Sequence, residues 1–283
     1  MPVTRSRPDD GELLLYAATT YGRLGKLPRA GELLRAASGS TSRVDWLRAA
    51  AALASGEGNV GQALEYWQEV ALTQPLSVEA QAQVARLMAM VEGRQKAGDY
   101  LAACADRFPH NYGLRQLQVE WEREGSREAR ENAVRKLVEI DPLDAWAHRE
   151  LGYVLTMLGR FDEARAEAEI AEQLEPESPY TASLRGYLAV RTEGLPAARQ
   201  HYRRAIELSI ESVFAIYELV RHCDSFESRR EELRFIQHEL ERQVGFGDAL
   251  LIFHETAQTT YAPEELLGGI REVRSALDSI HDA

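Results

Sequence analysis

The sequence predicts an all-α protein in which helical hairpins follow one another in tandem. The first observation is a set of regularly spaced prolines, with steps of 34, 33 and 34 residues: Pro75, Pro109, Pro142 and Pro176. A period near 34 residues is typical of repeats built from two antiparallel helices. With this spacing the chain divides into eight repeats, which begin at Gly11, Val44, Val78, Asn111, Ala145, Pro179, Val213 and Gly247.

Small residues recur at two positions of the repeat, the eighth and the twentieth. The two helices of a hairpin can approach closely only where such side chains face each other. Repeat four departs from this pattern with Gln118 and Arg130, so its hairpin is expected to open slightly or to turn both polar heads outward. The twentieth residues are Ala30, Ala63, Ala97, Arg130, Ala164, Ala198, Glu232 and Leu266.

The second helices and the turns follow the same period. The twenty-fourth and twenty-seventh residues are mostly apolar and lie on one helix face, so each second helix is expected to bury one stripe. Glycines recur where the first helix must stop, because glycine accepts the left-handed conformation at a helix C-terminus. These glycines are Gly25, Gly58, Gly125 and Gly159.

These residues resemble the tetratricopeptide repeat, and the match is best in 145–178, with Leu151-Gly152, Gly159 through Ala164, Ala171 and Pro176. The resemblance implies a right-handed superhelical solenoid of about eight antiparallel helix hairpins, whose first helices line a concave groove that commonly holds peptides. We expect an N-terminal tail over 1–10, six repeats of this kind over 11–212, and two degenerate repeats with a C-terminal capping helix over 213–283.

Composition excludes several classes of protein. The formal net charge of −12 argues against a nucleic-acid partner, since duplex binders concentrate Lys and Arg on one face. Two cysteines, Cys104 and Cys223, make a disulfide framework improbable, and both fall in apolar columns typical of buried packing. No apolar stretch reaches the roughly 20 residues of a membrane span, and the start lacks a secretory signal. We therefore expect a cytoplasmic location with no membrane contact, or the cut edge of a longer protein.

No residue pattern points to catalysis, a metal or a cofactor. The seven histidines do not cluster, and neither His148 nor His238 is followed by a second histidine four residues on, as a zinc helix requires. The segment 22–26 lacks the preceding strand and the Lys-Ser/Thr ending of a phosphate loop. We therefore predict no catalytic, cofactor-binding or metal-binding residues, and no enzyme.

The second, fifth and ninth residues of repeats four to seven carry the clearest functional signal. They share one face of the first helices and interleave aromatic rings with arginines, the residue types of protein-binding hot spots. Packing of the aromatic residues onto the neighbouring hairpin is the alternative explanation. The predicted peptide-binding groove contains Tyr112, Arg115, Trp146, Arg149, Tyr153, Tyr180, Tyr187, Phe214, Tyr217 and Arg221.

The leading functional prediction is a non-catalytic scaffold whose groove binds a protein or peptide with acidic and apolar residues. The alternative is a regulatory or targeting module of a larger multidomain protein, possibly flanking an enzyme domain. Single-stranded RNA binding is a third hypothesis, against which the acidic balance counts. The sequence leaves the partner and the oligomeric state open.

Overall fold

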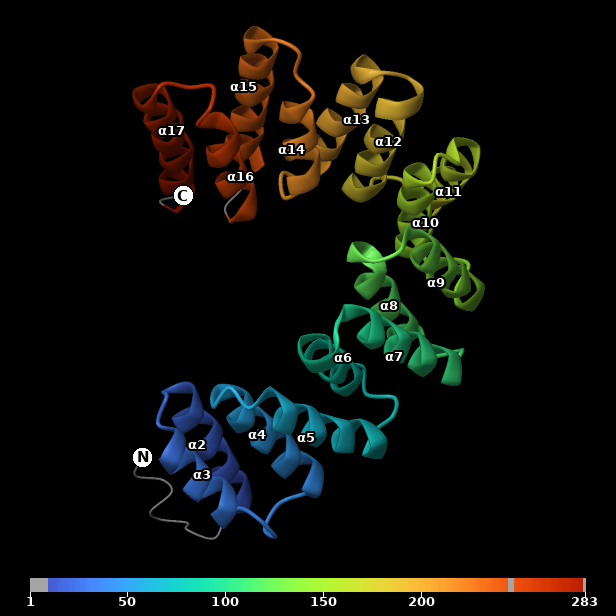
Figure 1. The fold of residues 1–283 in the computed structure, drawn as a ribbon. Coiled ribbons are helices and arrows are strands. Elements are labelled where there is room, and N and C mark those ends of the chain that lie inside the picture. The colour runs from blue at the N-terminus through green and yellow to red at the C-terminus, as the bar shows by residue number, and fades with distance from the viewer. Residues whose placement is uncertain (1–9, 244–246, 282–283) are drawn as a thin grey trace. The chain divides into compact units, whose positions relative to one another are not determined.

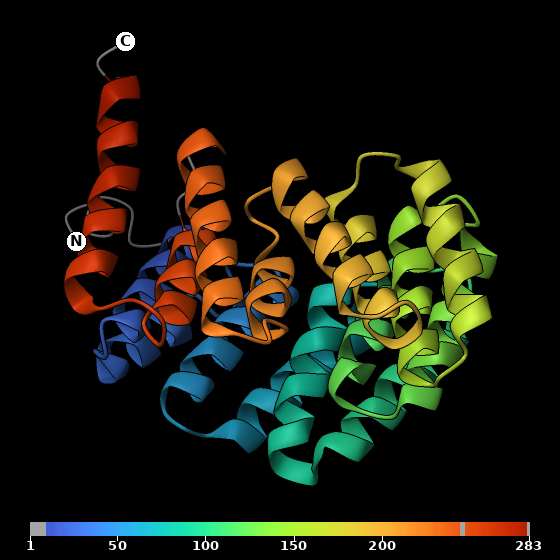
Figure 2. The same ribbon diagram turned by 90° about the horizontal axis from the view of Figure 1, so that it is seen from above.

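The computed structural model describes residues 10–243 and 247–281, and within these ranges it contains sixteen α-helices, one short 3-10 helix and no strand (Figure 1). Figure 2 shows the same helices from above. The predicted all-helical hairpin fold is confirmed. No helix within these ranges is long and apolar enough to cross a membrane.

The chain forms two compact units, Met1–Ile140 and Asp141–Ala283, called here the N-terminal and the C-terminal unit. The first helix of every repeat begins within one residue of the predicted start. The helices of the N-terminal unit are α2 (Gly11–Arg23), α3 (Leu27–Ala36), α4 (Arg43–Gly56), α5 (Val60–Thr73), α6 (Val78–Glu92), α7 (Arg94–Arg107), α8 (Tyr112–Trp121), η1 (Glu122–Glu124) and α9 (Arg127–Ile140).

The C-terminal unit continues the pattern with four more pairs of helices. Its last helix packs against the second helix of repeat seven. The expected domain boundary between residues 212 and 213 rests on loss of the repeat signature and stays a prediction. The helices are α10 (Ala145–Met157), α11 (Phe161–Leu174), α12 (Pro179–Thr192), α13 (Leu195–Leu208), α14 (Val213–Arg221), α15 (Phe226–Gln243), α16 (Asp248–Ala257) and α17 (Pro263–His281).

Polar side chains mark where several first helices begin. Ser42, Ser77, Asn111 and Asp144 each accept a hydrogen bond from a backbone N–H in the first turn of the following helix. Such N-caps satisfy donors that the helix itself leaves without partners, and each is typically worth about 1 kcal/mol. The repeat therefore begins at a specific residue in each of these hairpins.

The small-residue columns form the centre of each hairpin. Ala30, Ala63, Ala97, Ala164 and Ala198 are all buried. Repeat four does not turn both polar heads outward, because Gln118 and Arg130 are buried. The other expectation, a slightly opened hairpin, stays a prediction. A hydrogen bond of 2.6 Å from Arg115 to the Gln118 amide oxygen compensates for part of the cost of burying Gln118.

The C-terminal capping helix carries the expected apolar stripe in the part that is described. Leu266 and Val273 are buried, and Ile270 packs beside them on the core that α12 to α16 contribute. The side chain of Leu277, the fourth residue of that stripe, lies outside the described residues. The packing of α17 against α15 is consistent with a cap, which stays a prediction.

The crossing in repeat six is the tightest of those in the C-terminal unit that a glycine occupies. A Cβ built on Gly186 would lie 2.6 Å from an edge carbon of the Tyr202 ring, and Tyr202 is 1% exposed. The missing side chain of Gly186 therefore creates the space that the Tyr202 ring fills.

Replacing Gly186 with alanine should lower the free energy of unfolding by about 1–3 kcal/mol, because overpacking in a dense core forces neighbours to shift. The matched control is Gly268→Ala, where a Cβ would meet nothing within 4 Å and alanine should favour the helix by up to about 1 kcal/mol. Urea unfolding followed by circular dichroism compares the two. Equal midpoints would contradict the crowding argument.

Candidate protein-binding face of the first helices

The first helices of the C-terminal unit pack next to one another in chain order, α10 on α12, α12 on α14 and α14 on α16. Each second helix packs against its own first helix in repeats five to seven. One side of this row of first helices is therefore free of second helices, and the predicted groove residues of repeats five to seven lie on these helices.

Three aromatic rings from successive first helices meet on this row. Tyr153, Tyr187 and Phe214 have ring centroids 5.6 to 6.0 Å apart, and we call them the ring cluster. The Tyr202 ring lies 6.3 Å from Phe214 and is buried. Tilted and edge-on contacts at these distances are the arrangement that aromatic quadrupoles favour. The sequence placed the three cluster rings on one face, and the structure brings them together.

The aromatic residues of the predicted groove differ in how much of their surface is exposed. Tyr180 is 63%, Tyr217 49% and Phe214 41% exposed, whereas Trp146 is half-buried. The exposed rings provide apolar area that a partner can cover. Half-buried Trp146 contributes to packing, and its role in ligand binding stays a prediction.

Tyr112 and Arg115 lie on α8, which belongs to the N-terminal unit. Tyr112 is half-buried and Arg115 is 2% exposed. The Arg115 guanidinium donates to Asp106 Oδ1 at 2.9 Å, to the Ala105 carbonyl at 3.1 Å and to Gln118. Arg115 therefore contributes to the packing between α7 and α8, and a role in ligand binding stays a prediction.

The other two predicted arginines also have carboxylate partners within the chain. Arg149 is buried, donates to Glu175 Oε2 at 2.5 Å and lies over the Tyr180 ring at 5.6 Å. Arg221 is exposed and donates to Glu218 at 2.9 Å, a hydrogen bond that raises the pKa of Arg221. A ligand carboxylate would therefore compete with an existing ion pair at either residue.

Arg191 is the cation that the sequence argument missed. Its guanidinium lies 3.9 Å from the centroid of the Tyr187 ring and donates to the Tyr187 carbonyl at 2.9 Å. No carboxylate among the described residues forms an ion pair with Arg191. The signal was available, because Arg191 follows Tyr187 by four residues and thus shares its helix face.

The Tyr202 hydroxyl is a second feature that sequence reasoning missed. Its oxygen is buried and has no hydrogen-bond partner among the described residues. Burial raises the pKa of Tyr202, so the hydroxyl stays protonated throughout the ordinary pH range. Because the ring is sequestered under Phe214, we assign Tyr202 to support of the ring cluster rather than to direct contact with a ligand.

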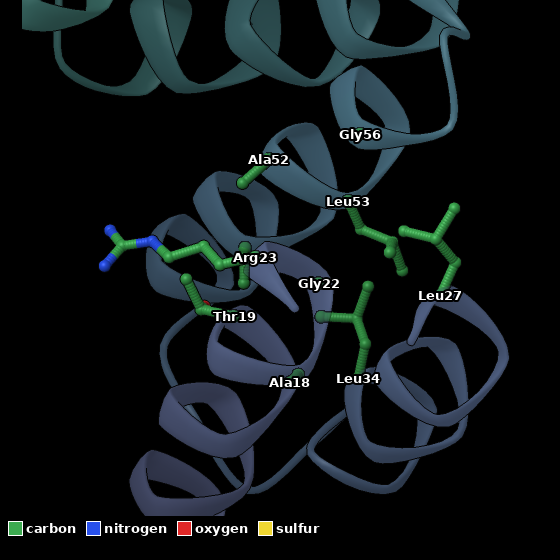
Figure 3. Close-up of a pocket in the computed structure, with 10 residues that line it drawn as sticks. Ala18, Thr19, Gly22, Arg23, Leu27, Leu34, Ala52, Leu53 and Gly56 are labelled. Atoms are coloured by element: carbon green, nitrogen blue, oxygen red, sulfur yellow. The ribbon is translucent and has the colours of Figure 1, made fainter. Parts of the chain in front are cut away.

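A small apolar pocket lies in the N-terminal unit between the first helices α2 and α4 and the second helix α3 (Figure 3). Its volume is about 220 Å³. In Figure 3 the side chains of Leu27, Leu34 and Leu53 converge, while the Arg23 guanidinium extends away from them. The ninth residues here are Thr19 and Ala52, where repeats five and six carry the tyrosines of the ring cluster. The short side chains of Thr19 and Ala52 border this hollow.

Comparison with known proteins gives similarity at the level of solved structures. No family model matches the chain, and no curated protein matches its sequence. A structure of MamA (residues 41 to the end, from Desulfovibrio magneticus RS-1) is 18% identical, with 61% of this chain and 98% of that chain covered at a TM-score of 0.47. YrrB, described as a TPR protein with an unusual peptide-binding site, is 16% identical, with 62% and 91% covered at a TM-score of 0.45. The helical hairpins of this chain, which recur at a period of about 34 residues, agree with the fold that the resemblance to the tetratricopeptide repeat implies.

The ion pair between Arg115 and Asp106 predicts how the stability of the protein depends on pH. Hydrogen bonds from Lys136 and Arg115 hold the pKa of the Asp106 carboxyl below its usual value. A carboxyl whose pKa is lowered by folding contributes stability above its unfolded pKa of about 4, and this contribution is lost as the pH falls through the folded pKa.

Asp106→Asn should therefore lower the free energy of unfolding at pH 7 by about 1 kcal/mol, a modest value because the carboxylate is largely exposed. The deficit should shrink as the pH falls below about 4, where the wild-type carboxyl also becomes neutral. Urea unfolding at several pH values measures it. Glu124→Gln, which breaks an ion pair whose carboxylate is 80% exposed, serves as the control and should change little. A deficit independent of pH would refute the electrostatic explanation.

Proposed function

We propose that the chain is a non-catalytic protein-binding scaffold, and that the first helices of its C-terminal unit hold an extended peptide or a protein loop. The observation that carries this proposal is the ring cluster, to which three successive first helices each contribute one ring. A segment that crosses α10, α12 and α14 would contact all three helices in turn.

The chemistry of the face favours apolar anchors in the ligand. Tyr180 and Tyr217 are exposed on the same first helices that contribute the packed ring cluster, so a ligand would find rigid apolar surface without much ordering of the protein. Aromatic anchors of this kind lose few rotamers on binding and account for much of the affinity at protein interfaces.

Acidic residues in the ligand would pair first with Arg191. The guanidiniums of Arg149 and Arg221 already have carboxylates, so a ligand would gain only the difference between two ion pairs there. Arg191 stacks on the ring cluster and has no such partner among the described residues, so its remaining N–H groups are open to a carboxylate. We therefore propose Arg191 as the residue that selects an acidic side chain.

A double variant, Tyr180→Ala with Tyr217→Ala, should weaken peptide binding by about thirtyfold or more, because truncating even one such anchor typically costs about 2 kcal/mol or more. The probe is a peptide selected from a random displayed library on the full chain, with affinity measured by fluorescence anisotropy. Both tyrosines are exposed, so folding should be unaffected, whereas half-buried Trp146 would be a poorer target.

The matched control for this double variant is Tyr16→Ala, which removes a tyrosine that is 67% exposed on α2 in the N-terminal unit. Its affinity should equal that of the wild type. Selection of no peptide, or equal affinity of the double variant and the control, would defeat the proposed function.

Arg191→Gln should weaken binding of a selected acidic peptide by about tenfold and should reduce the dependence of its affinity on salt concentration. Arg221→Gln is the control and should have a smaller effect, because Glu218 already neutralises that guanidinium. Anisotropy titrations at low and high salt measure both variants. An equal or larger loss in Arg221→Gln would show that the acidic residue of the peptide binds elsewhere.

A further inference from the structure

A second pocket lies between two second helices of the N-terminal unit, α5 and α7, with α6 as its floor. Its volume is about 370 Å³, within the range of pockets that bind ligands. We call it the second-helix pocket. Its apolar lining is formed by Ala71, Leu72, Pro75, Tyr100, Cys104 and Phe108. None of these residues belongs to the proposed peptide-binding face, so the two sites can be tested separately.

The floor of the second-helix pocket is polar but already satisfied. Gln81 is 4% exposed, and its amide nitrogen donates to the Pro75 carbonyl at 3.0 Å. Its amide oxygen accepts hydrogen bonds from the Tyr100 hydroxyl and, at 3.5 Å, from the Cys104 thiol. A ligand side chain in the pocket would therefore gain mainly apolar contact, because this buried amide already has partners for both of its polar atoms.

The mouth of the second-helix pocket carries exposed apolar surface. Leu72 is 79% exposed at the rim, and Phe108 is half-buried opposite it. A single exposed leucine is ordinary, but a leucine at the edge of an apolar hollow adds area that a bound side chain can cover.

The rim of the pocket also carries a positively charged side chain, that of Arg107. The Arg107 guanidinium lies 5.3 Å from the centroid of the Phe108 ring, and no described carboxylate forms an ion pair with it. The neighbouring Asp106 carboxylate is engaged by Arg115 and Lys136, at 2.9 Å from each. A positive charge held on a ring at the edge of an apolar pocket is complementary to a carboxylate next to an apolar side chain.

We propose that the second-helix pocket is a docking site for a segment of a partner protein that carries an apolar side chain beside a carboxylate. The apolar side chain would enter between Leu72 and Phe108, and the carboxylate would pair with Arg107. The charge of Arg107 determines this choice of occupant, because an apolar segment without an acid would leave the guanidinium without a counter-charge.

Cys104 makes the proposal testable without a known partner. Its thiol lines the pocket, and burial raises the pKa of Cys104 above that of a free thiol. Cys223, which follows α14 in the other unit, is also half-buried with a pKa raised by burial. Cys223 is half-buried like Cys104 but does not line the second-helix pocket, so it serves as an internal control.

The experiment is thiol–disulfide exchange at equilibrium with the full chain. The symmetric disulfides of mercaptopropanoyl-leucine, its carboxamide and mercaptopropanoyl-alanine are each incubated with the protein and a competing small thiol. Exchange joins one tail to a cysteine sulfur and releases one free tail thiol. Peptide mass spectrometry then gives the fraction of Cys104 and of Cys223 that carries each tail.

We expect Cys104 to favour the leucine tail over the alanine tail by about tenfold, since burial of the extra carbons is favourable. It should also favour the acid over the carboxamide severalfold, and Cys223 should show neither preference. Leu72→Ser should reduce the first preference and Arg107→Gln should abolish the second; both residues are exposed, so the fold should survive.

Three results would overturn the proposal. The first is the same order of tails at Cys104 and Cys223. The second is an acid preference that persists in Arg107→Gln. The third is stronger enrichment of a straight-chain mercapto acid than of the leucine tail, which would indicate a fatty-acid site. Loss of peptide binding on the first helices would leave these outcomes unaffected.

Discussion

Close contact between two helices at a crossing of small residues is the constraint on which the rest of the structure depends. Ala164 and Ala198 are buried at such crossings, and Gly186 in repeat six has no side chain at all. The space beside Gly186 is filled by the Tyr202 ring, which in turn lies against Phe214. The missing side chain of Gly186 therefore makes room for the Tyr202 ring, which supports the ring cluster through Phe214.

In repeat seven, ion pairs to the preceding hairpin occur where other repeats carry a small residue. Glu232 occupies the twentieth position of repeat seven and is 1% exposed, and it accepts from Arg203 at 2.8 Å and pairs with Arg199 at 3.3 Å. Both arginines belong to α13, the second helix of the preceding repeat. A buried carboxylate without these partners would be strongly destabilising, whereas a paired one specifies which helix lies beside it. The sequence shows a glutamate, Glu232, in place of a small residue, but it does not show that α13 compensates for it.

Features that depend on local spacing were predictable, and features that depend on distant partners were not. The 34-residue period located the starts of first helices within one residue, and a shared helix face predicted that Tyr153 and Tyr187 would lie together. The partner of Arg149 is Glu175, which lies 26 residues further along the chain, directly after α11. Spacing along a single helix does not predict such a contact. The pocket near Thr19 and Ala52 was equally hidden, because a hollow depends on what every surrounding side chain leaves empty.

The pairing of arginines explains where recognition can occur in so acidic a chain. Acidic residues outnumber Lys and Arg by 45 to 33, so an arginine near the surface will usually find a carboxylate of its own chain. This is so for Arg115, Arg149 and Arg221, whose charges are largely neutralised by carboxylates of the same chain. Arg107 and Arg191 instead lie over aromatic rings, at 5.3 and 3.9 Å. A ring holds a guanidinium in place without neutralising it, so its N–H edge stays available to an external carboxylate. In both places the ring belongs to an apolar surface, so charge and apolar area are presented together to the same ligand.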